Sequence, residues 1–225
     1  MNTILCELND PGISGLESYS PFCLKVHRAL RLQDVPYERR HGKMPSEFSH
    51  INPLGQVPVL LVDDVPICDS TEILQFLNVE GNGEAKLWEE LADTTLNGFL
   101  VAARWADDEN WPATKSEYFG AMPAPLRAFL PARIRQGIIK NLKARGTWLG
   151  GAKACWAHFE KILDALEERA PSEEYWLGDT ISVADLGLFA QLHSLRQDIT
   201  PRQKTSIAAR SQLSAYLDRV DHATQ

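Results

Sequence analysis

Short apolar runs separated by turn residues make the first third of the chain resemble a small sheet. Residues 3–8 and 58–62 are apolar runs of the kind that form buried strands, and residues 37–41 and 65–68 suit two more. Asp63 and Asp64 separate two of these runs, which is the spacing of a two-residue hairpin turn. We therefore expect four strands, the last two joined as a hairpin.

Helical spacing follows the first and the last of these strands. A loop rich in Gly, Pro and Ser leads to Pro21, which suits the first residue of a helix because its φ is already fixed. Apolar residues then recur at helical spacing with cations between them, which predicts a helix over residues 22–33. On this pattern Lys25, Arg28 and Arg31 face away from the core. Residues 73–77 predict a second helix. The order predicted for this part is β-α-β-β-β-α.

The rest of the chain is predicted to be helical. Gly81, Asn82 and Gly83 break the pattern, so we expect a linker at 81–85 between a mixed α/β domain at 1–80 and an all-helical domain at 86–225. Apolar residues recur at three and four residues, most clearly over 88–103 and more weakly over 126–142 and 155–166. Ser182 and Asp185 have capping-box spacing before an apolar run with few polar positions, which predicts a central helix.

Composition and charge narrow the class of protein. Among 225 residues, 44% are hydrophobic and 24% charged, which suits a folded globular chain and excludes a disordered one. Lys and Arg number 23 against 30 Asp and Glu, and a net charge of −7 argues against a nucleic-acid partner. No apolar run approaches the roughly 20 residues of a membrane helix, and no signal peptide is recognisable. We expect a cytoplasmic protein with no membrane partner.

The four cysteines predict neither a metal site nor disulfides. They lie far apart and have no zinc-binding spacing, so we expect no metal. Cys6, Cys68 and Cys155 are interpreted as small buried apolar residues.

The first motif with chemical potential is Tyr19-Ser20-Pro21-Phe22-Cys23 at a strand-to-helix junction. A group just before a helix meets the positive end of the helix dipole and unpaired backbone N–H groups, which favour an anion. The Ser20 hydroxyl could donate to a thiolate held there. A plain N-cap is the alternative.

Two further motifs follow along the chain. Residues 52–60 read Asn-Pro-Leu-Gly-Gln-Val-Pro-Val-Leu, and a cis Val57–Pro58 bond would expose the Val57 backbone to a peptide-like ligand. Asp69-Ser70-Thr71 opens the next helix, where Asp69 suits an ammonium group and Ser70 with the helix end suits a carboxylate. An ordinary turn and an N-cap are the alternatives.

These motifs together resemble the cytosolic glutathione transferases over nearly the whole chain. The matching segments are Ser20-Pro21-Phe22-Cys23, residues 52–60, Asp69-Ser70-Thr71-Glu72-Ile73, and Trp176-Leu177-Gly178-Asp179 with the Ser182-to-Asp185 block. The resemblance implies a thioredoxin-like first domain and an all-helical second one. Ser20 is similar to the catalytic serine of zeta- and theta-like classes and to the cysteine of omega-like members, so the class stays unassigned. Cys23 matches the resolving cysteine of a C-x-x-C motif.

The same resemblance implies glutathione as co-substrate and assigns residues to it. Ser20 matches the catalytic position, and the glutathione contacts match Lys43, Gln56, Val57, Asp69 and Ser70. Six cations against two acids over residues 25–43 give a local excess of +4, which suits an anionic ligand. For the electrophile we expect a pocket between the domains walled by Phe99, Trp105, and Trp111 or Tyr118.

The expected function is a glutathione-dependent transferase acting on a small hydrophobic electrophile. A zeta-like glutathione-dependent isomerase and a non-catalytic glutathione- or partner-binding module on the same fold remain alternatives. The resemblance also implies a homodimer, with a face involving the helix after Asp69 and residues 88–99.

Overall fold

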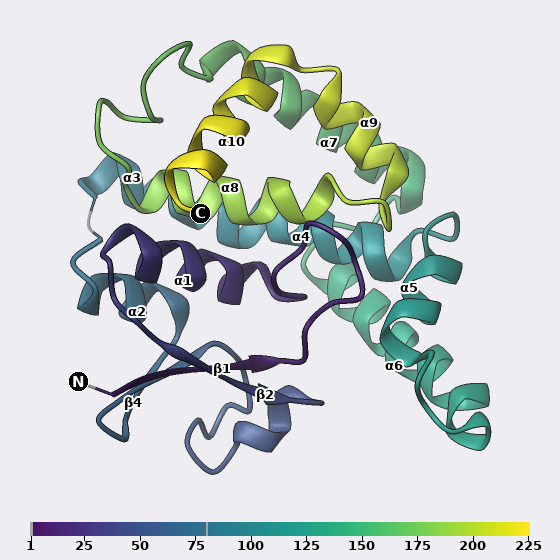
Figure 1. The fold of residues 1–225 in the computed structure, drawn as a ribbon. Coiled ribbons are helices and arrows are strands. Elements are labelled where there is room, and N and C mark those ends of the chain that lie inside the picture. Colours follow the sequence, from purple (N-terminus) through teal and green to yellow (C-terminus); the bar gives the residue numbers. More distant parts are fainter. Residues whose placement is uncertain (1, 80) are drawn as a thin grey trace.

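A computed structural model describes residues 2–79 and 81–225. Met1 and Glu80, the two ends of the expected first domain, lie outside the described residues. A four-stranded sheet and its helices are followed by a larger group of helices (Figure 1). The predicted fold class, a thioredoxin-like α/β part followed by an all-α part, is confirmed.

The first part contains these elements in chain order: β1 (Thr3–Leu8), α1 (Pro21–Leu32), β2 (Glu38–Gly42), the short 3-10 helix η1 (Pro45–Phe48), β3 (Val59–Val62), β4 (Val65–Cys68) and α2 (Ser70–Phe76). The strand order is β2-β1-β3-β4, with β1 parallel to β2 and antiparallel to β3. Asp63 and Asp64 both have positive φ, as a tight hairpin turn between β3 and β4 requires. The predicted hairpin is therefore confirmed.

The sheet buries a different set of side chains on each face. Leu5 and Leu60 face α1 and α2 and belong to the main core. Ile4, Cys6 and Val59 face the other way and pack against Phe48 of η1. The period-two alternation of the strands explains why adjacent residues enter two different clusters.

The second part consists of helices, with one π-helical segment joining the first two and another following the second. Its elements are α3 (Gly83–Leu91), the π segment η2 (Ala92–Leu96), α4 (Asn97–Val101), the π segment η3 (Ala102–Ala106), α5 (Trp111–Phe119), α6 (Ala124–Ala144), α7 (Gly151–Arg169), α8 (Val183–Leu195), α9 (Pro201–Ala208) and α10 (Ser211–Ala223). The helix α3 begins at Gly83, inside the segment expected to be a linker. Among the described residues, no helix combines the length and the apolar character needed to cross a membrane.

The helix α8 lies at the centre of the molecule, as its sequence predicted. Every residue from Val183 to Leu195 is buried. Asp185 caps its start by accepting hydrogen bonds from the backbone and hydroxyl of Ser182, at 2.9 and 2.8 Å. The same carboxylate accepts from the Trp176 backbone N–H and the Tyr216 hydroxyl. A buried carboxylate needs several donors, and here they tie α10 to the start of α8.

The cations of α1 correct the sequence interpretation of that helix. Lys25 is fully buried, and its Nζ lies 2.9 Å from Glu89 and 2.6 Å from Asp93. Arg28 is also buried and pairs with Asp221. These side chains do not face solvent, because α1 packs between the sheet and α8 and meets acids from distant segments (Figure 1).

His193 of α8 fastens the loop between β1 and α1. Its Nε2–H donates to the Gly15 carbonyl at 2.9 Å, and its Nδ1 lies 3.4 Å from the Arg196 guanidinium. Burial lowers the pKa of His193, and the charges of Arg196 and Arg28 lower it further against the opposing effects of the Gly15 bond and Asp221. The native state therefore prefers the neutral imidazole.

We expect this histidine to make stability depend on pH. The unfolded chain takes up a proton on His193 near its ordinary pKa of 6.5, whereas the folded chain resists it, so the free energy of unfolding falls as the pH drops below 6.5. The loss grows by about 1.4 kcal/mol for each unit separating the two pKa values. Urea unfolding at about pH 8 and about pH 5.5 measures it. His193→Gln should flatten this slope, and His222→Gln, at an exposed site on α10, should leave it intact.

Candidate functional site

A cavity of about 250 Å³ lies at the start of α1, the end of β4 and the start of α2. We call it the first-domain pocket. Its lining comes from the start of α1, the turn before β3, the end of β4 and the start of α2. The lining residues are Phe22, Asn52, Leu54, Gln56, Val57, Pro58, Cys68, Asp69 and Ser70. Four of the residues expected to contact glutathione, Gln56, Val57, Asp69 and Ser70, thus share one cavity.

The turn before β3 is held from within by Asn52. Its side-chain amide donates to the Gln56 carbonyl at 3.0 Å, and its Oδ1 accepts from the Leu54 N–H at 3.1 Å. The Val57–Pro58 bond is cis, as the sequence allowed. Neither backbone polar group of Val57 has a partner within residues 2–79 and 81–225. An extended ligand can therefore pair with Val57 as an added strand would.

Asp69 and Ser70 line the first-domain pocket at the start of α2. Asp69 is the N-cap: its Oδ1 accepts from the Thr71 N–H at 2.8 Å. Its φ of +79° is in a region that costs most residues energy, although Asp and Asn tolerate it better than others. Ser70 is only 4% exposed. An exposed carboxylate beside free N–H groups can receive a zwitterionic end, an ammonium on Asp69 and a carboxylate on the helix end.

Ser20 lies at the start of α1 as its N-cap. Its Oγ accepts from the Cys23 N–H at 3.3 Å, so its own hydroxyl proton remains available to donate. Ser20 is half-buried and does not itself line the first-domain pocket, but Phe22, two residues on, does. A sulfur placed at this helix end would meet both the hydroxyl and the positive end of the helix dipole.

The neighbours of Ser20 are less available for chemistry. Burial raises the pKa of the Tyr19 hydroxyl, and the Glu117 carboxylate, which accepts a hydrogen bond from that hydroxyl at 2.6 Å, raises it further. Burial likewise raises the pKa of the Cys23 thiol, with the negative charge of Glu7 adding to the effect. Cys23 is fully buried. Tyr19 is therefore committed to a structural bond, and Cys23 stays a thiol.

Arg104 is a site residue that the sequence analysis missed. It lies in η3, is 3% exposed, and donates from Nη1 to the Tyr19 carbonyl at 2.7 Å. The same Nη1 reaches the Tyr118 hydroxyl at 3.1 Å, while Nη2 donates to the Ser194 carbonyl at 3.2 Å. Arg104 thus joins the residue before Ser20 to the helical part. In the sequence, the available signal was a cation inside an otherwise apolar helical stripe. In the structure, Arg104 lies in a π segment, and such segments are frequent at functional sites.

The other predicted residues lie apart from the first-domain pocket. Lys43 follows β2, is exposed, and does not line it, although its backbone N–H donates to Glu47. Trp105 packs against Trp111 and Tyr118, with ring centres 6.0 and 5.1 Å apart, and Tyr118 in turn contacts Tyr19 at 4.7 Å. These rings form an aromatic wall beside the Ser20 segment.

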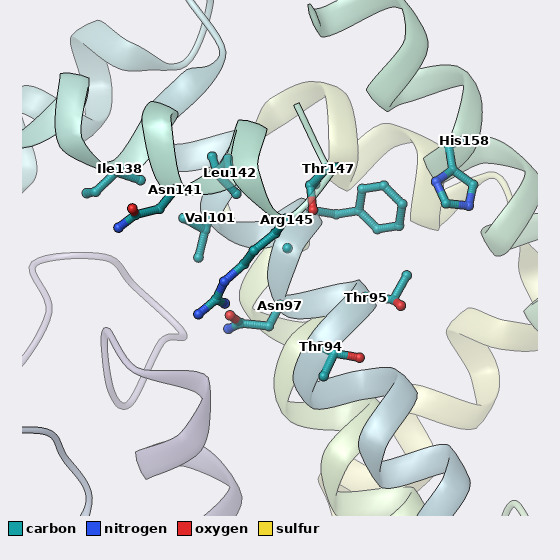
Figure 2. A pocket seen from close by; sticks show the side chains of 13 residues that line it. Thr94, Thr95, Asn97, Val101, Ile138, Asn141, Leu142, Arg145, Thr147 and His158 are labelled. Carbon is teal, nitrogen blue, oxygen red and sulfur yellow. The ribbon is translucent and has the colours of Figure 1, made fainter. Parts of the chain in front are cut away.

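Phe99, the remaining aromatic candidate, faces another space. It lines a cavity of about 760 Å³ among α4, α6 and α7, together with Thr94, Asn97, Arg145 and His158 (Figure 2). Its ring packs edge-on against His158 and Phe159 of α7. The structure therefore does not bring Phe99 to the aromatic wall.

The local positive charge inferred for residues 25–43 is largely cancelled. Four of the six cations pair with carboxylates: Lys25, Arg28, Arg31 and Arg39. Their partners are mostly distant in sequence, from Glu7 to Asp221. No group of three or more metal-binding side chains occurs in the part of the chain that the structure describes.

Comparisons with known proteins agree with this architecture. A family model described as glutathione S-transferase, N-terminal domain, matches residues 19–80, and one for the C-terminal domain matches residues 132–219. A Pseudomonas fluorescens glutathione transferase family member, solved with two glutathione molecules bound, has a similar fold with a TM-score of 0.60. It is 14% identical, and the match covers 99% of this chain and 92% of that one.

Two curated relatives carry different kinds of name. A metaxin-2 homolog of Caenorhabditis elegans is 25% identical over 77% of this chain and 79% of its own length. Glutathione S-transferase F13 of Arabidopsis thaliana is 28% identical over 65% of this chain, and the match spans 59% of its own length. With both family models matched in order on the expected fold, the chain belongs to the cytosolic glutathione transferase superfamily.

Proposed function

We propose that the protein is a transferase that activates the thiol of glutathione for attack on a small hydrophobic electrophile. The proposal rests on the first-domain pocket. There the free backbone of Val57 lines the same cavity as Asp69 and Ser70. An extended tripeptide with a zwitterionic end matches these groups in kind.

In this proposal each group holds a different part of glutathione. Val57 pairs with its backbone, Gln56 contacts the rest of the tripeptide, and Asp69 accepts hydrogen bonds from the α-ammonium of the γ-glutamyl end. The exposed Lys43 lies outside the pocket and would meet only a part of the tripeptide that extends beyond it. Ser70 and the start of α2 hold the neighbouring carboxylate. The thiol then points toward the start of α1, where Ser20 lies.

Ser20 and the helix end supply the activation. A free thiol has a pKa of about 8.5, so only a few per cent is thiolate at neutral pH. Lowering that pKa by about two units requires roughly 2.7 kcal/mol of preferential thiolate stabilisation. One hydroxyl donor and a helix N-terminus together can provide this amount. The thiolate sulfur then forms a bond to the electrophilic carbon, and a leaving group departs with the displaced electron pair.

The aromatic wall of Trp105, Trp111 and Tyr118 is the proposed site for the electrophile. It lies beside Tyr19 and therefore beside the Ser20 segment. Aromatic faces suit a small apolar substrate.

Replacing Ser20 tests this mechanism. Ser20→Ala removes the donor but leaves Val57, Asp69 and Ser70 in place. We expect the pKa of bound glutathione to rise by about one unit, and conjugation near neutral pH to slow about tenfold, while glutathione affinity barely changes. Thiolate absorbance against pH measures the first, and initial rates measure the second. Full activity in Ser20→Ala would place the donor elsewhere, with a backbone N–H the first candidate because Tyr19 is engaged by Glu117.

A non-catalytic binding module is the second candidate. Its support is the similarity to the metaxin-2 homolog, a name that denotes no enzymatic activity. Calorimetry with glutathione and a panel of electrophiles separates the two: retained binding with no turnover on any electrophile favours the module. A glutathione-dependent isomerase uses the same thiolate, so isomerisable substrates belong in the panel.

We also propose a two-fold homodimer in the cytoplasm. The dimer face would involve α2 and the segment from Trp88 to Phe99, which is continuous from α3 to α4. A monomer in light scattering would count against it.

A further inference from the structure

The positive charge of this acidic protein is concentrated in one segment. Seven of the 23 Lys and Arg fall between Tyr118 and Phe159, and none of the 30 Asp and Glu does. The segment therefore carries +7 in a chain of −7. It begins at the end of α5, includes all of α6 and ends in α7. A block of one sign this long, inside a chain of the other sign, indicates an interaction surface.

Most of these cations are free to meet a partner. Arg135 pairs with Asp108. The other six are exposed and form no ion pair within residues 2–79 and 81–225: Arg127, Arg133, Lys140, Lys143, Arg145 and Lys153. This contrasts with α1, where Lys25 and Arg28 are buried in ion pairs.

Apolar side chains are exposed on the same helix. Leu126 is 45% and Phe129 is 58% exposed. Leu126, Phe129, Arg133 and Lys140 follow one another at intervals of three, four and seven residues, so they share one face of α6. That exposed face therefore presents two large apolar groups at the N-terminal end of α6 and two cations further along.

The α5–α6 hairpin projects from the body of the molecule (Figure 1). Residues 123–129 are all exposed, so the tip is open to solvent. Leaving Leu126 and Phe129 in water costs free energy that burial elsewhere would recover.

We propose that this tip and the exposed face of α6 dock on an anionic lipid bilayer. The two apolar side chains insert at the level of the headgroups, and the six exposed cations are attracted to the negative surface, each adding to the affinity. A projecting convex tip suits a flat, deformable surface. A nucleic-acid duplex would engage the cations but give Leu126 and Phe129 nothing to enter, so the apolar pair favours lipid. This departs from the sequence prediction of no membrane partner, which rested on the lack of a long apolar run and of a recognisable signal peptide.

The test is co-sedimentation of the full chain with vesicles of phosphatidylcholine, with and without phosphatidylserine. Two double variants test the two components of the surface separately. Arg133→Glu with Lys140→Glu reverses two of the cations. Leu126→Ser with Phe129→Ser removes the apolar pair. The control, Lys86→Glu with Arg202→Glu, makes the same change in charge at exposed residues of α3 and α9. All substituted positions are exposed, so folding should be retained, and circular dichroism confirms it.

We expect binding only to the vesicles that contain phosphatidylserine, weakening as salt rises. Each cation near an anionic surface is worth about fivefold in affinity, so the charge-reversal variant should lose about 25-fold or more. The serine variant should also bind more weakly, and the control should bind like the parent.

Several outcomes would overturn the proposal. One is equal binding to both kinds of vesicle, and another is equal losses in the variants and the control. Binding to a DNA duplex without binding to vesicles would assign the surface to nucleic acid. A change of oligomeric state in the charge-reversal variant, with no vesicle binding by the parent, would assign it to a second copy of the chain. None of these measurements involves glutathione, so the result is independent of the proposed transferase activity.

Discussion

Arg104→Ala should produce the largest loss of stability of any single substitution considered for this protein. The side chain is 3% exposed and satisfies the Tyr19 and Ser194 carbonyls together with the Tyr118 hydroxyl. Truncation leaves these buried and half-buried acceptors without a charged donor, which costs about 3–5 kcal/mol. For a chain of this size that corresponds to a fall in melting temperature of very roughly 10 °C.

The substitution should also reach the site, because Tyr19 directly precedes Ser20. We expect Arg104→Ala to cost more free energy in the pKa of bound glutathione than in the affinity for glutathione. A purely structural role would not produce this difference. Arg104→Lys keeps the charge but lacks the planar fork, so it should be intermediate.

Arg135→Ala is the matched control for this experiment. Arg135 also donates to backbone carbonyls of η3, those of Trp105 and Ala106, but it contacts neither Tyr19 nor Ser20. Its loss should lower the melting temperature and leave the pKa of bound glutathione unchanged. If both variants changed that pKa equally, Arg104 would have no specific positioning role.

Asp69 should have the largest effect on glutathione binding. Asp69→Ala removes the carboxylate proposed to hold the α-ammonium, and a lost charge-assisted hydrogen bond costs about 1.5–3 kcal/mol. Glutathione affinity should fall roughly ten- to a hundredfold, as calorimetry measures. Alanine also loses the cap on the Thr71 N–H and must adopt a φ of +79°, so it should destabilise the fold by a further 1–3 kcal/mol or so.

Asp69→Asn separates binding from folding. Asparagine can still cap α2 and tolerates a positive φ, but it carries no charge. Its melting temperature should stay near that of the parent while its affinity falls as in the alanine variant. An Asn variant that bound glutathione as the parent does would reduce Asp69 to a cap.

Features encoded by neighbouring residues could be predicted from the sequence. The hairpin at Asp63 and Asp64 follows from two residues that tolerate positive φ between apolar runs, and the start of α8 follows from Ser182 and Asp185 three residues apart. The grouping of Val57, Asp69 and Ser70 came from the family resemblance. Their motifs directly precede β3 and α2, so the fold brings them to one place.

Features that depend on distant partners could not be predicted. The periodicity of α1 assigns Lys25 to a polar face, because nothing local shows that Glu89, 64 residues away, will meet it in the interior. Arg104 was missed for the same reason: its acceptors are supplied by Tyr19 and Ser194, 85 and 90 residues away. Within the part predicted to be helical, α9 and α10 were not singled out. In α9 Ile207 is the one buried apolar residue, which leaves little pattern to read. In α10 the signal was present, since Leu213, Tyr216, Leu217 and Val220 have the spacing of one buried helix face.

Because α1 lies between the sheet and α8, we expect the two parts of the molecule to unfold together. One core holds Leu24 and Leu30 of α1 together with Leu60 of the sheet and Leu188 of α8. The glycine-flanked linker therefore separates two segments of the chain, but these segments do not unfold independently. Cutting there would leave the first part with a bare apolar helix face and with Lys25 stripped of both its acids. An uncompensated buried cation is too costly to keep in a folded state, so the thioredoxin-like part behaves as half of one folding unit.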